Sequence, residues 1–152
     1  MAYTTAEGRE QVLGDLAVAI EQIADALAAL GEAYEQLDER AGDVLEEKLF
    51  RPVQSAYGRA RRTHSEFAAR TGLKSRSFEP HSAGRAGQSV QSLIERAVDA
   101  VSDADQSIAD LQDSMLPVEV GDPELRAGLS SVRETLSGVS LRARDLTRTV
   151  GR

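Results

Sequence analysis

The chain has 152 residues, no cysteine, no tryptophan and a formal net charge of -7 at pH 7. Without cysteine there is no disulfide framework, no thiolate metal ligand and no cysteine nucleophile. Three tyrosines and three phenylalanines are too few for the stacking platforms that bind single-stranded nucleic acids. We expect a single domain over residues 1–152, because a chain of this length can bury a core without disulfides or metals.

The sequence contains no ordinary secretory signal, because its first residues lack a basic segment followed by an apolar one. No apolar run approaches the ~18 residues that a membrane span requires. These features predict a cytoplasmic protein, and export that needs no signal peptide stays open as an alternative.

The first predicted helix covers residues 5–41. Its apolar and small residues follow alternating steps of three and four, the period of helices packed at shallow angles. These positions are Leu13, Leu16, Ile20, Ile23, Leu27, Leu30, Tyr34, Leu37 and Ala41. We place the C-terminal cap of this helix at Gly42 and the N-cap of the next at Asp43. The alternative is that residues 39–43 stay helical within a longer, bent coiled coil that closes only as a dimer.

The second predicted helix covers residues 44–71 and continues the apolar seam. Its seam positions are Val53, Tyr57, Ala60, His64, Phe67 and Thr71. Upstream, Leu45 and Leu49 reach Val53 in steps of four, so the phase slips near Pro52, where we expect a kink. Gly72 suits the C-terminal cap of this helix.

The third and fourth predicted helices cover residues 88–116 and 123–150, with the same apolar period. Asp122 followed by Pro123 predicts a sharp start for the fourth helix. Residues 74–88 are rich in serine, glycine and charge and predict a long loop. Three apolar residues between the last two helices are expected to cover one end of the core: Leu116, Val118 and Val120.

Four segments of similar length predict an all-α fold, an antiparallel up-down-up-down four-helix bundle with heptad-like seams. The net charge alternates along the chain, with -10 for residues 1–47, +7 for 48–85, -7 for 86–123 and +3 for 124–152. We therefore expect each helix to lie between neighbours of opposite sign, an arrangement that disfavours wrong pairings. The arginines of the second helix should then face acidic residues in 21–35 and 99–113.

A candidate interaction surface combines outward apolar residues with the basic residues of the second helix. Its members are Val18, Leu141, Arg51, Arg59, Arg62 and Arg70. Nucleic acid is not the expected partner, because a binding domain would carry a broad basic face and this chain is acidic overall. The expected partner is another protein or a second copy of the chain.

Motifs for chemistry are missing from the sequence. The residue three before His64 is Arg61, and the residue three before His81 is Phe78, so the Glu-x-x-His pairs of di-iron bundles are absent. There is no Gly-x-Ser-x-Gly motif and no phosphate-binding loop. We accordingly predict no metal, no cofactor and no catalytic residue. His64 falls on the seam, and we predict a buried, neutral histidine whose protonation would loosen the bundle.

These observations predict a non-catalytic interaction protein that acts as a scaffold, an adaptor or an assembly subunit. Two alternatives stay open. One is a helical protein of membrane surfaces or of secretion, which is less favoured because acidic helices would repel anionic lipids. The other is a ligand-binding or enzymatic bundle with a pocket that residue spacing does not reveal.

Overall fold

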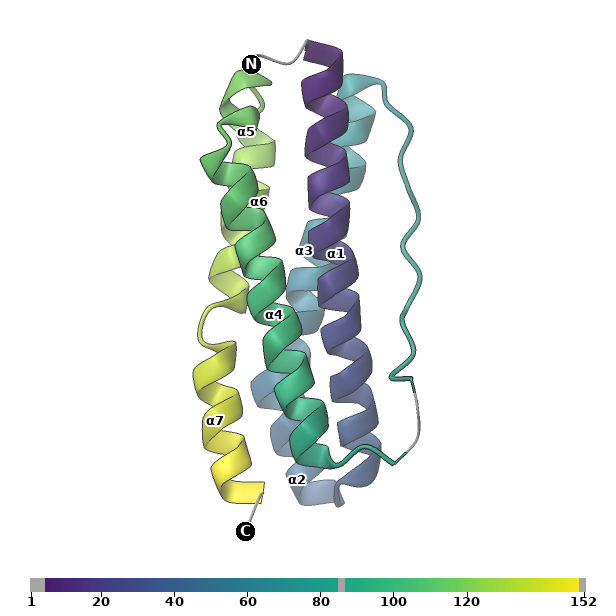
Figure 1. The fold of residues 1–152 in the computed structure, drawn as a ribbon, viewed down its shortest axis with the longest axis vertical. Helices are drawn as coiled ribbons and strands as arrows, with labels where there is room; N and C mark the ends of the chain where they lie inside the picture. Colours follow the sequence, from purple (N-terminus) through teal and green to yellow (C-terminus); the bar gives the residue numbers. More distant parts are fainter. Residues whose placement is uncertain (1–4, 85–86, 151–152) are drawn as a thin grey trace.

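The computed structural model describes residues 5–84 and 87–150, which form an all-α bundle (Figure 1). Four long helical segments lie side by side, and a short helix lies at one end. Their bounds in chain order are α1 Thr5–Gln36, α2 Glu39–Leu45, the π-helical turn η1 Glu46–Phe50, α3 Arg51–Thr71, α4 Val90–Asp113, α5 Leu116–Glu119, α6 Pro123–Leu136 and α7 Val139–Val150. The predicted antiparallel four-helix bundle is confirmed, with α1 packed on α4 and α3 packed on α6.

One connected core runs through the bundle and is built almost entirely from aliphatic side chains of all four segments. Each fully buried leucine or isoleucine contributes about 1.5–3 kcal/mol relative to an exposed one. The first seam lies in this core from Leu13 to Leu30, but it weakens toward its end, where Tyr34 is exposed. The apolar period therefore identified the buried face of α1 over most of its length.

The direction of the helices follows from one connection that runs the length of the bundle (Figure 1). Residues 72–84 leave the end of α3 and run back beside α1, and residues 87–89 lead into α4 near the end of α1. The side-chain amide of Gln36, the last residue of α1, donates to the carbonyl of Gln88 at 2.9 Å. Consequently α3 and α4 run in the same direction. Helices that pack against each other are still antiparallel, but the direction does not reverse at every step along the chain.

This topology overturns the expected charge pattern. The acidic helices α1 and α4 are direct neighbours, and α3 lies between α1 and α6. Among the described residues, the arginines of α3 make no ion pair with the acids of 21–35 or 99–113. Arg51 instead pairs with Glu46 at 3.8 Å, and Arg70 pairs with Asp122 at 2.8 Å. The signs are thus sorted onto two sides of the bundle.

Two polar contacts join the acidic helices α1 and α4. Arg96 of α4 donates to Asp25 of α1 at 2.6 Å, and this hydrogen bond raises the pKa of the arginine. Ser107 of α4 donates to the side-chain oxygen of Gln22 at 2.8 Å. A single basic residue placed at the interface offsets part of the repulsion between the two helices.

The predicted turn at Gly42 and Asp43 is wrong, because the break occurs earlier, at Asp38. The Asp38 carboxylate accepts the N–H of Ala41 at 2.8 Å, which makes Asp38 the N-cap of α2. Gly42 lies inside α2, where a Cβ would approach the ring of Tyr34 to 3.2 Å. Residues 39–43 are therefore helical, as in the rival interpretation, but the bundle closes within one chain.

The phase slip takes the form of a π-helical turn, η1, which ends at Phe50, before the proline where a kink was expected. The backbone N–H of Arg51 donates to the carbonyl of Glu46, five residues earlier. This turn adds one residue to the usual helical spacing, so Leu45, Leu49 and Val53 are all buried despite their steps of four.

The C-terminal part differs from the predicted helix 123–150. It is divided at Gly138, which has a positive φ of 82°, into α6 and α7. The apolar seam missed this break because Leu136 and Val139 are both buried on either side of it. At the other end, Leu116 covers the core as expected, whereas Val118 is 49% exposed.

Two predicted helix boundaries are confirmed. Gly72 has a φ of 72° at the end of α3, and the N–H of Leu73 donates to the Ala68 carbonyl at 2.9 Å. Asp122 caps α6 by accepting the N–H of Leu125 at 2.9 Å. Arg70 also contacts Asp122 through two hydrogen bonds, so one carboxylate caps α6 and fastens it to the end of α3.

The cap assignment yields a matched pair of variants. Asp38→Ala removes the acceptor for the Ala41 N–H and should lower the free energy of unfolding by about 1 kcal/mol. Asp43→Ala, at an exposed helical position, should change it by less than about 0.5 kcal/mol. Urea denaturation measures both values, and a larger loss in Asp43→Ala would restore the turn at Gly42.

The packing of α6 on α3 yields a second pair. A Cβ at Gly128 would lie 2.7 Å from Cγ2 of Thr63 and even closer to its hydroxyl. Gly128→Ala should therefore destabilise the fold by about 1–3 kcal/mol through overpacking. Gly31→Ala is the control, because a Cβ there meets nothing within 4 Å and should stabilise α1 by about 1 kcal/mol. Thermal unfolding of both variants should shift in opposite directions.

Candidate functional site

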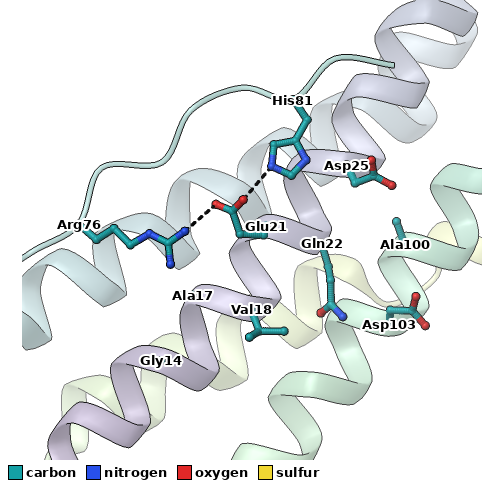
Figure 2. A pocket seen from close by; sticks show the side chains of 10 residues that line it. All are labelled: Gly14, Ala17, Val18, Glu21, Gln22, Asp25, Arg76, His81, Ala100 and Asp103. Atoms are coloured by element: carbon teal, nitrogen blue, oxygen red, sulfur yellow. Dashed lines mark hydrogen bonds and ion pairs between the residues drawn. The ribbon is translucent and has the colours of Figure 1, made fainter. Parts of the chain in front are cut away.

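A hollow on the described part of the molecule lies where residues 72–84, called the strap below, pass over α1 (Figure 2). It is an open cleft of about 550 Å³ between α1, α4 and the strap. Its residues are Gly14, Ala17, Val18, Glu21, Gln22 and Asp25 from α1, Arg76 and His81 from the strap, and Ala100 and Asp103 from α4. The helical spacing of the α1 members places them along one face.

Glu21 is the point where the strap is tied to α1. His81 Nε2 lies 2.9 Å from one Glu21 oxygen, and an Arg76 guanidinium nitrogen lies 3.6 Å from the other (Figure 2). The strap is held further on by Arg96, which donates to the Ala83 carbonyl. Glu21 is thereby occupied by two basic side chains, so the cleft presents no free carboxylate at this position.

His64 lies beneath the strap and is only 2% exposed, as the seam predicted. Its ring meets the edge of the strap's Phe78, with 5.1 Å between the ring centroids. Burial lowers the pKa of His64, a hydrogen bond to the Leu13 backbone acts in the opposite direction, and the charge of Arg76 lowers it further. No described residue forms a hydrogen bond with the Nδ1 atom of His64.

The predicted interaction residues do not come together into one surface. Val18 is 52% exposed on α1 and lines the cleft, whereas Leu141 is 59% exposed on α7. Helix α7 packs against α4 and η1 rather than α1. Whether either residue binds a partner stays a prediction.

The four arginines of the predicted surface lie along α3, but they differ in their surroundings. Arg51 and Arg70 are engaged in ion pairs. Arg59 has a buried Nε atom with no hydrogen-bond partner among the described residues, while Arg62 is exposed. The expected neutralisation by acids of α1 and α4 is not found, so the prediction against nucleic-acid binding now depends on the acidic net charge and on the scarcity of aromatic residues.

A row of exposed acidic residues on α4 was not recognised from the sequence. We call it the acidic stripe, and its members are Glu95, Asp99, Asp103, Asp110 and Asp113. Their spacing of four, four, seven and three places them on one side of the helix. Two other acids near α4 are paired instead. Asp25 pairs with Arg96 where α4 contacts α1, and Asp105 pairs with Arg133 where α4 contacts α6.

The described residues contain no group of three or more histidine, aspartate and glutamate side chains able to hold a metal ion. Within the same ranges, no helix combines the length and apolarity needed to cross a membrane. Comparisons with protein-family models, with curated proteins and with solved structures find no match to this chain. The geometry of the cleft and of the acidic stripe is therefore the basis for a functional proposal.

The environment of His64 predicts a pH-dependent stability. Because its pKa is lowered in the folded state, protonation favours the unfolded chain, and stability is lost as the pH falls below the ordinary value of 6.5. His64→Leu should therefore stabilise the fold more at about pH 5 than at about pH 8. Urea denaturation at both pH values measures the difference, and equal gains would show that His64 titrates without consequence.

Proposed function

We propose that this protein is a non-catalytic interaction protein, a scaffold, adaptor or assembly subunit, that binds a basic segment of a partner protein through its acidic stripe. The observation that supports the proposal is the side-by-side position of the two acidic helices. Together α1 and α4 carry thirteen acidic residues and two basic ones. One side of the bundle is therefore strongly negative.

The acids of the stripe are available to a partner. All five are exposed, and none forms an ion pair within the described residues. Asp103 also lines the cleft, which brings the stripe next to the exposed side chain of Val18. A lysine or arginine side chain could place its charge on the stripe and its methylene groups against this valine. Such an interaction would be steered by charge and weakened by salt.

A second copy of the chain is the other partner that we consider. Arg61 and Arg62 are exposed on α3, on the side of the bundle away from α4, and could meet the stripe of another molecule. Sedimentation at low and high salt separates this case, because self-association through these charges would raise the mass only at low salt.

The proposal is tested with a fluorescent lysine-rich peptide. The wild type should bind it in a salt-dependent manner, and the double variant Asp99→Asn, Asp103→Asn should bind about tenfold more weakly, because each exposed pair contributes ~0–1 kcal/mol. Fluorescence anisotropy at several salt concentrations measures the affinities.

The matched control is the double variant Glu66→Gln, Glu134→Gln. It removes the same charge from exposed positions of α3 and α6, so the net charge of both variants is equal. It should bind the peptide like the wild type. Equal losses in the two variants would mean that only net charge matters, and the stripe would not be a binding surface.

A further inference from the structure

A groove of about 420 Å³ lies between the first part of α4 and α7, which pack side by side (Figure 1). Its floor is apolar, because Ile94 and Ala143 are only 2% exposed and Val98 packs against the core. A second hollow of about 400 Å³ continues along α4 toward α6 and shares Ser140 with the groove. The contact of α4 with α7 is therefore open toward solvent along one side.

The two rims of the groove carry opposite charges. Glu95 and Asp99 line it from α4, and Arg144 and Arg148 line it from α7. All four side chains are exposed, and none of them forms an ion pair within the described residues. Glu95 accepts a hydrogen bond of 3.4 Å from Gln91, which belongs to the same helix. Two acids and two bases thus lie on opposite sides of the groove without meeting.

Unlike charges do meet further along α4. Arg133 of α6 donates to Asp105 of α4 at 2.9 Å. The helices therefore form an ion pair where α4 and α6 pack closely, whereas the groove keeps the rims of α4 and α7 too far apart for the same contact. The charges of the two rims are left for a partner that presents the opposite sign to each rim.

The two rims match each other in length and height. Helices α4 and α7 run in opposite directions, because the chain turns at α5 and returns through α6 and α7 (Figure 1). Each rim has two charges four residues apart, a distance of about 6 Å at 1.5 Å per residue. The antiparallel order places Glu95 level with Arg148, and it places Asp99 level with Arg144.

Such a face is complementary to itself. A twofold rotation about an axis parallel to the helices, above the middle of the groove, lays the acidic rim of one copy over the basic rim of the other. This rotation keeps every residue at its height, so Glu95 of each copy meets Arg148 of the other. Asp99 of each copy likewise meets Arg144 of the other. An axis across the groove would instead lay acid over acid and base over base, which is disfavoured.

We propose that the groove between α4 and α7 is an interface between two copies of this chain, which form a twofold dimer. Leu141 adds an apolar contact, because it is 59% exposed and precedes Arg144 by three residues on the same side of α7. In the dimer it lies over α4 of the other copy, level with the small side chain of Ser102. Exposed ion pairs are individually weak and are screened by salt, so the dimer is weak and forms best at low salt.

The dimer does not rest on the proposed function. It takes up Glu95 and Asp99 of the acidic stripe, but its basic half comes from α7, which has no part in peptide binding. A basic segment of a partner can still bind the remaining acids of the stripe. Either proposal can therefore fail without the other.

The test reverses the charges of one rim at a time and follows the mass by sedimentation equilibrium at low salt. The wild type should approach the mass of a dimer as its concentration rises to the millimolar range. Arg144→Glu, Arg148→Glu has two acidic rims, and Glu95→Arg, Asp99→Arg has two basic rims. Each variant alone should associate at least tenfold more weakly, because like charges then face each other. Circular dichroism checks that both variants are helical.

An equimolar mixture of the two variants is the decisive measurement. A copy with two acidic rims complements a copy with two basic rims, so the mixture should associate although neither variant does so alone. A wild type that stays monomeric at every concentration would overturn the proposal. A mixture that stays monomeric while both variants are folded would overturn it as well.

The matched control is Arg61→Glu, Arg62→Glu, which changes the net charge by the same amount at exposed positions of α3. It should dimerise like the wild type, and loss of association would place the contact on α3 instead. The variant Arg144→Glu, Arg148→Glu keeps every acid of the stripe, so it should still bind the lysine-rich peptide. Loss of the dimer with retained peptide binding separates this interface from the proposed function.

Discussion

The strap between α3 and α4 is the constraint on which the rest of the arrangement depends. An extended chain spans up to about 3.3–3.6 Å per residue, more than twice the 1.5 Å rise of a helix. Residues 72–84 can therefore run back along the neighbouring helix. Because they do, α4 starts at the end of α1 and packs against it, and α3 takes its place on the other side of α1. A short turn after Thr71 would have placed α4 antiparallel to α3 instead.

The charge distribution follows from this order of helices. With α1 beside α4, most acidic residues lie on one side of the bundle, and the exposed arginines of α3 lie on another. Local pairs such as Arg96 with Asp25 and Arg133 with Asp105 reduce repulsion at the helix contacts. They leave the outward acids of α4 unpaired. Although the sign of the charge alternates along the sequence, the folded molecule has one acidic side and one side that carries the exposed arginines, and the helix contacts do not neutralise these charges.

The strap also creates the cleft. It crosses α1 above the small side chains of Gly14 and Ala17, so there is space between strap and helix. Its ties to Glu21 and its Phe78 edge contact with His64 fix its position over that space. The cleft thus depends on a segment that has no regular secondary structure of its own.

The sequence by itself determined the helical class, the buried face of each helix, the burial of His64, and the boundaries at Gly72 and Asp122. These are local properties, since apolar period and capping chemistry act within a few residues of each other. It placed the first turn wrongly because Asp38 and Asp43 are both residue types that cap helices, and Asp38 is the one that caps α2.

Only the tertiary structure decided which helices are neighbours and what the strap covers. The path of a long irregular segment depends on contacts between distant residues, such as His81 with Glu21 and Gln36 with Gln88, and no period in the chain records them. Gly14 is a second example. From the sequence, a glycine within a helix only lowers the stability of that helix, and the structure is needed to show that the strap passes above it. The spacing of its residues could have revealed the acidic stripe on α4. The sequence could not have revealed that α1 is the helix packed beside it.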